Sequence, residues 1–366
     1  MVCHIACGVH ARIICSWVLV VRIQRVPLTS NTVPPTHRLT SAYDVGREVS
    51  KAVDQRQHRI GQYGLDPLFS LPDANWHETA PNDYINAYKM LSRLDWPTLQ
   101  FLRLRSQPFT GYNMLYLRNG AGFSCTDPIP PNLDHFQPDL PDNNVIFQWK
   151  AFTENLPNRL IYRPPLMLGE RGWLVDDDFV NHDVATYQER MALMAAGGVF
   201  EHLDRVEAPR IIEIGGGYGA LAYAIMSAYP NAEYWICDLP ESLMFSGLYL
   251  SMVQDQSVRV TQAGCEAVRG INLLPNYYFP FLGRSFDLAI NTLSMSEMSV
   301  HQVETYGAGL ARLLLDRQGM FFEQNQDNRR MGLCYSKEHL PKYFPNRRTV
   351  DTSLPISNGI ADIWSH

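Results

Sequence analysis

The stretch that most constrains how this chain folds is residues 210–238, RIIEIGGGYGALAYAIMSAYPNAEYWICD. It begins with a short β-branched run, which is typical of a strand buried on both faces of a sheet, and four glycines follow. Residues 220–229 are rich in Ala, Leu, Ile and Met and predict a helix, which Pro230 ends. Residues 234–237 predict a second apolar strand with Asp238 at its end. The stretch therefore predicts strand, glycine turn, helix and strand in succession.

The glycine turn has the chemistry of a nucleotide site. Glycines let the backbone turn tightly and approach a ligand closely, and the following helix points its N-terminal amides at that ligand. An acidic side chain at the tip of the second strand accepts hydrogen bonds from ribose hydroxyls, and Asp238 lies about 20 residues past the glycines. The spacing Gly215-x-Gly217-x-x-Ala220 also satisfies the dinucleotide fingerprint, so NAD or FAD remains an alternative ligand.

Glu213, two residues before the first glycine, favours a different nucleotide. A carboxylate at the mouth of the ligand cleft is unfavourable beside a pyrophosphate and well suited to a cationic ligand. The pattern Glu213-Ile214-Gly215-x-Gly217-x-Gly219 resembles motif I of the class I S-adenosylmethionine-dependent methyltransferases. In that family the first acidic residue lies near the methionine moiety, so the resemblance implies S-adenosyl-L-methionine as cofactor. The predicted cofactor-binding residues are Glu213, Gly215, Gly216, Gly217, Gly219, Asp238, Leu239 and Asn291.

Composition and charge limit the other classes of protein. The chain has 366 residues, of which 46% are apolar and 19% charged, as in an ordinary globular protein. Its net charge of −6 argues against a general nucleic-acid binder, which needs a basic surface. The seven cysteines include no CxxC pair, so we predict no zinc site and a reducing, cytoplasmic location.

The N-terminal leader, residues 1–30, has no clear assignment. It holds a nine-residue apolar run, residues 13–21, between two arginines. This run is far shorter than the ~20 residues that a helix needs to cross a bilayer, so we predict no stable membrane span. A signal peptide, a strand docked elsewhere and a gene-start artefact all remain open.

Residues 31–180 are predicted to form a mainly helical accessory or cap region. Residues 43–63 predict a surface helix, and apolar positions recur with helical spacing over residues 82–104. Residues 127–141 carry five prolines and predict an irregular arm that lies across the cleft. Residues 145–149 predict a short strand.

The last half, residues 181–366, is predicted to be an α/β domain with a doubly wound, mostly parallel, Rossmann-like sheet, because strands and helices alternate along it. Ser299 and Gln302 have the spacing of a capping box at the start of one helix. The further predicted helices cover residues 184–200, with Asn181 or Asp183 as cap, and 240–253. The further predicted strands cover residues 258–261, 285–292 and 320–323, and a closing hairpin precedes the C-terminus.

Three stretches together resemble one methyltransferase subfamily, the sugar O-methyltransferases. They are VNHDVATYQER at residues 180–190, IIEIGGGYGALA followed by CDLPE, and FDLAINTLSMSEMS at residues 286–299. The resemblance covers roughly the last half of the chain, and two positions depart from it: Val184, where threonine is expected, and Ala220, where glycine is expected. Membership would imply a class I methyltransferase fold and methyl transfer to a sugar hydroxyl.

A sugar hydroxyl is a weak nucleophile at neutral pH, so a general base near it is expected to contribute typically ~10²–10⁴-fold. His182 is the first candidate, because an unperturbed histidine pKa of about 6.5 suits the task. Asp183 is the second, either as the base or as the residue that orients His182. Glu297 is the third, since it follows the fourth strand. The alternative for all three is a structural role at the start of a helix.

Four further residues are predicted to bind substrate. Tyr187 and Arg190 lie three apart on one helix face, where they are candidates to meet sugar hydroxyls or the cofactor carboxylate. Glu323 and Asn325 follow the fifth strand and are candidates to reach the acceptor. Ordinary packing is the alternative for Tyr187 and Arg190.

Two other function classes remain open. An NAD-dependent oxidoreductase or epimerase would need a Tyr-x-x-x-Lys pair or a similar constellation after the cofactor motif, and we find none. A non-catalytic binding module would keep the cofactor motif without turnover. The aspartates at residues 176–178 predict a solvated turn, with a divalent-metal site as the alternative, and no HxH or paired-carboxylate spacing requires a metal. The expected partner is a small-molecule or glycan acceptor and no nucleic acid, with a homo-oligomer left open.

Overall fold

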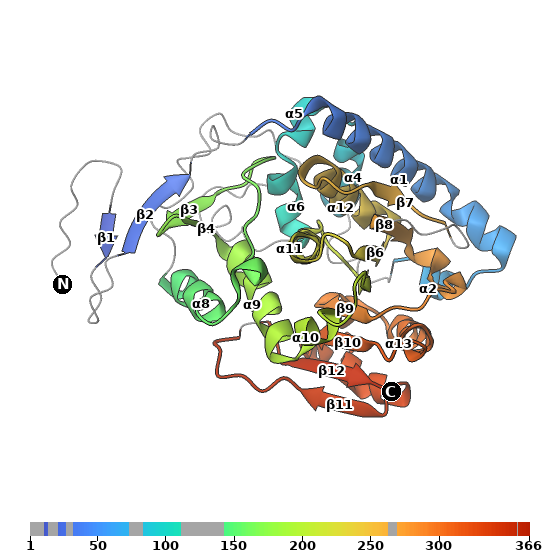
Figure 1. The fold of residues 1–366 in the computed structure, drawn as a ribbon. Coiled ribbons are helices and arrows are strands. Elements are labelled where there is room, and N and C mark those ends of the chain that lie inside the picture. The colour runs from blue at the N-terminus through green and yellow to red at the C-terminus, as the bar shows by residue number, and fades with distance from the viewer. Residues whose placement is uncertain are drawn as a thin grey trace.

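We describe the protein with a computed structural model. The structure describes residues 11–13, 21–26, 32–72, 83–110, 143–262, 269–356 and 358–366. The proline-rich segment 127–141, predicted to be an irregular arm, lies outside the described residues, as does most of the leader 1–30. An eight-stranded sheet lies at the centre of the molecule, and a separate four-stranded sheet lies to one side of it, on the left in Figure 1.

The eight-stranded sheet confirms the predicted doubly wound, mostly parallel architecture. Its strand order is β11-β12-β10-β9-β5-β6-β8-β7. Strand β12 is antiparallel to both of its neighbours, β11 and β10, and all the other neighbouring pairs are parallel. The strands are β5 (Arg210–Ile214), β6 (Glu233–Asp238), β7 (Val258–Val260), β8 (Gly270–Pro275), β9 (Leu288–Thr292), β10 (Met320–Gln324), β11 (Asn346–Thr349) and β12 (Ala361–Ser365). The predicted strands and the closing hairpin are therefore present.

One strand, β8, was not predicted from the sequence. It lies between β6 and β7, so β7 is the edge strand of the sheet. Its sequence GINLLP is a short apolar run without alternation, and periodicity alone does not identify such a strand. The sequence analysis therefore predicted the strand at residues 258–261 but none at residues 270–275.

Both faces of the sheet are buried, as the β-branched run of β5 predicted. Ile211 belongs to one hydrophobic cluster, whereas Ile212 and Ile214 belong to a second on the other face. The first face is covered by α9 (His182–Ala196), α10 (Val199–Leu203), α11 (Ala220–Ala228) and α12 (Pro240–Val253). The second is covered by α13 (Val300–Leu315) and the 3₁₀ helix η4 (Asn276–Phe281).

Side-chain caps start two of these helices as predicted. The Ser299 hydroxyl accepts from the Gln302 N–H, and the Gln302 side chain accepts from the Ser299 N–H, which completes the capping box of α13. Asn181, one of the two predicted caps of α9, accepts a hydrogen bond from the Val184 N–H at 2.8 Å.

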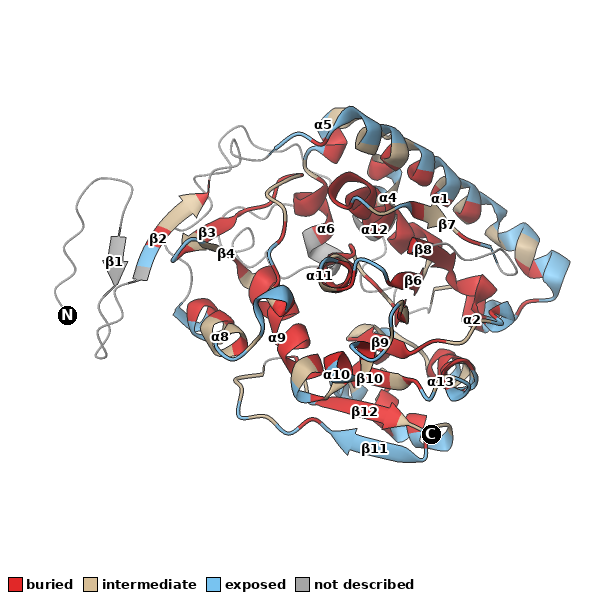
Figure 2. Ribbon diagram, in the orientation of Figure 1, coloured by how far each residue is buried: buried red, intermediate tan, exposed pale blue. Residues whose placement is uncertain are grey.

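The N-terminal region is mainly helical, as predicted. Its longest helix, α1 (Thr36–Tyr63), packs along α12. Every residue of α12 is buried, because the sheet covers one side of this helix and α1 covers the other (Figure 2). The shorter helices are α2 (Pro67–Ser70), α4 (Asp83–Leu91), α5 (Trp96–Leu99), α6 (Leu102–Thr110), α8 (Asn143–Thr153) and η3 (Asn158–Leu160).

The strand predicted at residues 145–149 is wrong, since these residues lie within α8. The buried positions of α8 are Val145, Ile146, Trp149 and Phe152, and this spacing is that of one helix face. The five residues of the predicted strand are too few to show the helical repeat. The helical spacing predicted over residues 82–104 is divided among α4, α5 and the start of α6. Residues 96–97 begin α5, where Asp95 caps the N-terminus and proline occupies the first turn.

The four-stranded sheet consists of β1 (Ala11–Ile13), β2 (Val21–Val26), β3 (Gly172–Val175) and β4 (Asp178–Val180), all antiparallel. Part of the leader is thus a strand paired with β3, which was one of the alternatives left open. The tight turn between β3 and β4 holds Asp176 and Asp177 at positive φ, in agreement with the predicted turn.

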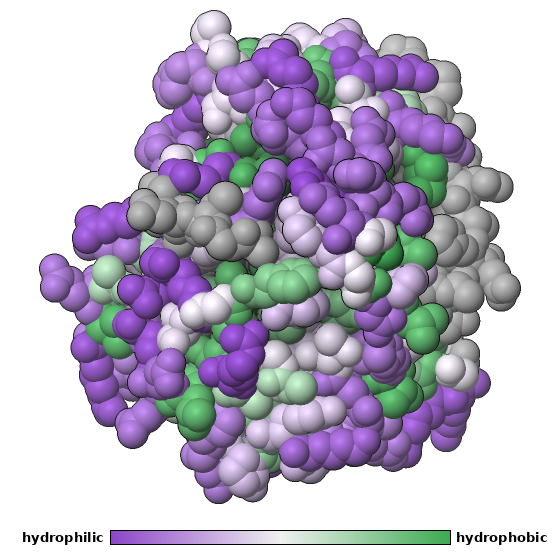
Figure 3. Space-filling model, turned by 90° about the vertical axis from the view of Figure 1, so that its right-hand side faces the viewer, coloured by the Kyte–Doolittle hydropathy of each residue, from purple (hydrophilic) through white to green (hydrophobic). Residues whose placement is uncertain are grey.

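The surface is mixed in character. On the face shown in Figure 3, hydrophilic side chains predominate and hydrophobic ones lie between them. No helix within the described residues is long and apolar enough to cross a bilayer.

Short 3₁₀ helices complete the C-terminal half: η5 (Ser294–Glu297), η6 (Arg329–Met331), η7 (Ser336–Glu338) and η8 (Leu340–Lys342).

Candidate active site

The strand order locates a ligand site at the carboxyl end of β5. This strand pairs in parallel with β6 on one side and with β9 on the other, so the order of the sheet reverses at β5. In doubly wound sheets a ligand binds outside the carboxyl ends of the strands at such a switch point. The glycine turn, residues 215–219, follows β5 at this end.

Two glycines of this turn cannot be replaced without strain. Gly215 has φ +75°, and a Cβ on it would lie 2.2 Å from Ser294 Oγ. Gly219 has φ +95°, and a Cβ on it would lie 2.8 Å from Leu250 Cδ1. Gly219 precedes α11, and no side chain caps the N-terminus of that helix. The turn is therefore a cradle of bare backbone at a helix N-terminus, which fits a nucleotide-bearing cofactor.

Glu213 lies directly beneath the cradle. Its Oε2 atom accepts a hydrogen bond from Tyr234 Oη at 2.9 Å and would lie 3.2 Å from a Cβ on Gly216. Burial raises the pKa of Glu213 to about 7, and the negative charge of Asp238 acts in the same direction. The Glu213 carboxylate is thus held under the turn in a setting that favours a nearby positive charge.

Asp238 ends β6 beside the same turn. Its carboxylate accepts a hydrogen bond from the Leu239 N–H at 2.8 Å. Burial raises the pKa of Asp238 to about 7, while the backbone N–H groups of Leu239, Gly217 and Gly216 and the Ser242 hydroxyl favour the charged form. Two carboxylates therefore flank the glycine turn at the ends of adjacent strands.

A small cavity of about 60 Å³ opens between these strand ends. It contains four predicted site residues: Gly215, Asp238, Leu239 and Glu297. The sequence analysis missed its other lining residues, which are Pro72, Cys237, Ser242, Asn276, Ser294, Met298, Gln302 and Tyr306. Asn276 follows β8, so a correct assignment of that strand would have identified this position as a strand end. The buried Asn276 Oδ1 atom has no hydrogen-bond partner among the described residues, which leaves an acceptor for a ligand.

Asn291, predicted to bind the cofactor, forms hydrogen bonds that join three chain segments. Its Nδ2 atom donates to the Ile214 carbonyl at 2.8 Å and to Ser294 Oγ at 2.5 Å. Its Oδ1 atom accepts from the Met295 N–H and from Asn325 Nδ2. This side chain therefore holds the end of β5 against the loop that follows β9.

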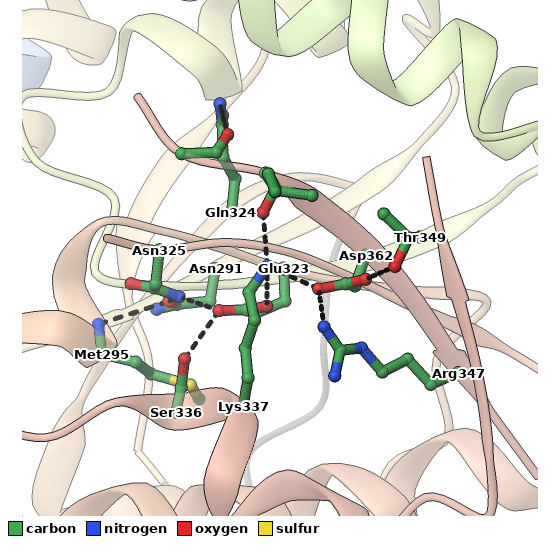
Figure 4. Close-up of polar contacts among 12 residues, drawn as sticks. Asn291, Met295, Glu323, Gln324, Asn325, Ser336, Lys337, Arg347, Thr349 and Asp362 are labelled. Atoms are coloured by element: carbon green, nitrogen blue, oxygen red, sulfur yellow. Dashed lines mark hydrogen bonds and ion pairs between the residues drawn. The ribbon is translucent and has the colours of Figure 1, made fainter. Parts of the chain in front are cut away.

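Glu323 and Asn325, predicted to bind substrate, belong to the same buried network (Figure 4). Asn325 Nδ2 donates to Glu323 Oε1 at 2.6 Å, and Asn325 Oδ1 accepts from the Ser296 N–H. The other partners of Glu323 are the Ser336 hydroxyl, which donates at 2.7 Å, and Lys337, whose Nζ lies 3.7 Å away. Neither Glu323 nor Asn325 is among the residues that line the cavity described above. Both side chains brace the loop that carries Ser294 and Glu297.

The remaining predicted residues lie on α9. Asp183 is buried, and its Oδ2 atom forms an ion pair with Arg103 Nη2 at 2.5 Å. Arg103 also pairs with Glu170 at 2.6 Å, and its guanidinium lies 3.7 Å from the centre of the Tyr218 ring in the glycine turn. Asp183 thus belongs to an ionic cluster behind the turn. His182, at the first position of α9, is half-buried.

Tyr187 and Arg190 lie between this ionic cluster and Glu213. The Tyr187 ring packs edge-on against Tyr218, with 5.8 Å between the ring centres. The Arg190 guanidinium lies 4.5 Å from the centre of the Tyr187 ring, and its positive charge acts on Glu213. The described residues contain no group of three or more histidine, cysteine or carboxylate side chains that would hold a metal ion.

Comparisons with known proteins agree with this site. Residues 172–265 match a family model described as an O-methyltransferase domain, and this segment contains β3 to β7 and the whole glycine turn. No curated protein sequence matches the chain.

Solved structures with partial similarity include an O-methyltransferase candidate from Nostoc punctiforme, at 14% identity and a TM-score of 0.34 over 51% of this chain and 61% of that chain. An amino pentose methyltransferase from Micromonospora echinaspora, with bound S-adenosylmethionine, aligns at 12% identity and a TM-score of 0.34 over 47% of this chain and 89% of that chain. Structural similarity at TM-scores this low does not establish the family of this chain. The O-methyltransferase match of residues 172–265 includes the glycine cradle and both carboxylates beside it, Glu213 and Asp238.

Proposed function

We propose that this protein is an S-adenosylmethionine-dependent O-methyltransferase that methylates a hydroxyl of a sugar or a glycosylated small molecule. The observation that carries the proposal is the pair Glu213 and Asp238, one beneath and one beside a glycine cradle at the switch point of the sheet. The O-methyltransferase match over residues 172–265 supports the reaction class. The sugar acceptor rests on the three sequence stretches that resemble sugar O-methyltransferases.

The residues of the site have separate tasks in this proposal. The bound cofactor supplies a methyl group on a positively charged sulfur. Asp238 accepts hydrogen bonds from the ribose hydroxyls, and the backbone of Gly215 to Gly219 allows close approach. Glu213 compensates positive charge on the methionine part of the cofactor. Asn291 and Asn325 keep the β5 end and the following loops at fixed spacing, so that positioning supplies much of the rate.

Glu297 is the general base that we would test first. It is an exposed residue that lines the cavity, whereas Asp183 is buried in an ion pair with Arg103. His182 remains the second candidate. Glu297→Gln is expected to lower kcat by about 10²–10⁴-fold and to leave cofactor affinity unchanged. The matched control is Glu207→Gln, which removes an exposed carboxylate outside the site.

The cofactor assignment is tested by isothermal titration with S-adenosylhomocysteine and, separately, with NADH. We expect S-adenosylhomocysteine to bind and NADH not to bind. Asp238→Ala should weaken S-adenosylhomocysteine by about 10- to 150-fold, since hydrogen bonds to a charged group contribute about 1.5–3 kcal/mol. Asp351→Ala, at an exposed position, should leave the affinity unchanged. Binding of NADH alone would overturn the assignment in favour of an oxidoreductase.

The acceptor class is tested by mass spectrometry after incubation with a methyl-labelled cofactor. A panel of free sugars, glycosylated small molecules and aglycones separates the acceptor types. A labelled methyl group on the sugar fragment is the expected result. Methylation of the aglycones alone would contradict the sugar acceptor while leaving the methyltransferase in place.

A further inference from the structure

The glycine turn between β5 and α11 has a single side chain by which the rest of the protein can hold it. Four of its five residues, 215–219, are glycine, and the fifth is Tyr218. Glycine loses more backbone freedom on folding than any other residue, so a turn made of glycines needs a restraint from outside to keep one conformation. The side chain of Tyr218 is fully buried and is the anchor available for that restraint.

Tyr218 is held by its ring rather than by its hydroxyl. The Arg103 guanidinium lies 3.7 Å from the centre of the ring. The Tyr187 and Tyr249 rings pack edge-on against the same ring, with 5.8 Å and 5.1 Å between the ring centres. No hydrogen bond of ordinary geometry joins the buried Tyr218 hydroxyl to the described residues. A cation is attracted to the face of an aromatic ring, most strongly where water is excluded, so the guanidinium is the strongest restraint on this ring.

Arg103 belongs to the accessory region, not to the α/β domain that carries the turn. It lies on α6, and its side chain is fully buried. Glu170 and Asp183 pair with its guanidinium at 2.6 Å and 2.5 Å and fix the orientation of this planar group. Glu170 precedes β3, and Asp183 lies in the first turn of α9. The guanidinium thus joins three segments outside the turn to the one side chain within it.

We propose that Arg103 is a positioning residue, whose guanidinium holds the Tyr218 ring and thereby keeps the glycine turn in the conformation that binds the cofactor. The inference rests on the proposed function for the identity of the ligand. In this role Arg103 acts through Tyr218 and does not touch the ligand. The apparent affinity of a ligand falls with the fraction of molecules in the binding-competent conformation. Loss of the restraint therefore weakens cofactor binding although no contact to the cofactor is removed.

Two measurements test the inference. Hydrogen–deuterium exchange of the ligand-free protein reports how well the peptide with residues 215–219 is ordered. Isothermal titration with S-adenosylhomocysteine reports cofactor affinity. The variants are Arg103→Met and Tyr218→Leu, each of which removes one side of the contact, and the double variant. Arg103→Lys, which keeps the charge beside the two carboxylates but lacks the planar group, is a milder second variant.

Two controls separate this role from other effects. Tyr218→Phe is the matched control, because phenylalanine keeps the ring and loses only the hydroxyl. Leu314→Ala controls for loss of stability alone, since it leaves a cavity in the core. Leu314 is fully buried at the C-terminal end of α13, in the hydrophobic cluster on the other face of the sheet from Tyr218.

We expect Arg103→Met and Tyr218→Leu each to raise deuterium uptake by the turn peptide and to weaken S-adenosylhomocysteine by about 5- to 30-fold, as for the loss of a desolvated cation–π contact. Arg103→Lys should change both quantities in the same direction. In the Tyr218→Leu background, Arg103→Met should weaken binding by less than about twofold more, because the contact is already lost. Tyr218→Phe and Leu314→Ala should match the wild type in both measurements. In turnover assays, Arg103→Met should raise KM for the cofactor and leave kcat nearly unchanged.

Other results overturn the inference. Wild-type deuterium uptake by the turn peptide in Arg103→Lys and Tyr218→Leu would show that the turn is ordered without this contact. Equal effects of Tyr218→Phe and Tyr218→Leu would assign the restraint to the hydroxyl. Multiplying effects in the double variant would mean that Arg103 and Tyr218 act independently. If the wild-type protein did not bind S-adenosylhomocysteine, the proposed function would fail, whereas the exchange data on ligand-free protein would still decide whether Arg103 orders the turn.

Discussion

Gly215→Ala is the substitution whose effect the structure defines most closely. The position has φ +75°, and an added Cβ would lie 2.2 Å from Ser294 Oγ and 2.4 Å from Ser294 Cβ. The left-handed backbone costs a residue with a Cβ about 1–2 kcal/mol, and overpacking costs about 1–3 kcal/mol more. We therefore expect the free energy of unfolding to fall by about 2–5 kcal/mol.

Two other glycines separate these contributions. Gly64, after α1, has φ +60° and no atom within 4 Å of an added Cβ, so Gly64→Ala should cost only the backbone strain of about 1–2 kcal/mol. Gly61, inside α1, has neither a positive φ nor a close atom, so Gly61→Ala should stabilise by about 0.5–1 kcal/mol. Urea denaturation of the three variants, with the wild type as reference, measures all these differences.

The clash with Ser294 is tested by a double-mutant cycle. Ser294→Gly removes both close atoms and leaves Ser294 Cα, at 3.9 Å, as the nearest part of that residue. In this background Gly215→Ala should cost about as much as Gly64→Ala, which gives a coupling energy of about 1–3 kcal/mol. If Gly215→Ala were no more destabilising than Gly64→Ala in the wild type, the close approach of the two loops would not constrain the turn.

Three predictions concern buried charge. Arg103→Met should lower the free energy of unfolding by about 3–5 kcal/mol at pH 7, because Glu170 and Asp183 lose their buried cation. Burial already raises the pKa of Glu170, so this deficit should shrink as the pH falls to about 5, and equal deficits at both pH values in urea denaturation would contradict the argument. Burial raises the pKa of Glu213 and of Asp238 to about 7, above their values in the unfolded chain. The folded state therefore binds more protons than the unfolded state. The free energy of unfolding of the ligand-free protein should consequently fall as the pH rises from about 4 to about 7. Ionisation of the same groups should strengthen S-adenosylmethionine binding as the pH rises through 7, and titration calorimetry should show a flatter pH profile for Glu213→Gln.

Much of the sheet could be predicted from the sequence, because its signals are local. The β-branched run of β5, the glycines and the apolar run of β6 lie within one short stretch, and each reports its own backbone preference. The capping box of α13 needs only Ser299 and Gln302, three residues apart. Helix α8 was misassigned because the window was shorter than two helical turns, and β8 was missed because it has no alternation.

The roles of the site residues depend on contacts that local patterns do not contain. Asp183 forms its ion pair with Arg103, 80 residues earlier in the chain, and Asn291 bonds to the Ile214 carbonyl, 77 residues earlier. Such pairs form only when loops close over long separations, and nothing in either segment alone specifies the partner. The local sequence around a carboxylate at the start of a helix is therefore the same whether the carboxylate acts as a general base, caps the helix or forms an ion pair.

The sequence by itself determined the strand–turn–helix–strand unit and the two carboxylates beside it, because spacing along the chain sets which residues stand at strand ends. Tertiary structure alone decided that Glu297 borders the cavity, that Asp183 is paired in the interior and that Arg190 is buried against the Tyr187 ring. The physical reason is that burial and pairing of charge are properties of the packed molecule and arise between segments that are distant in the sequence.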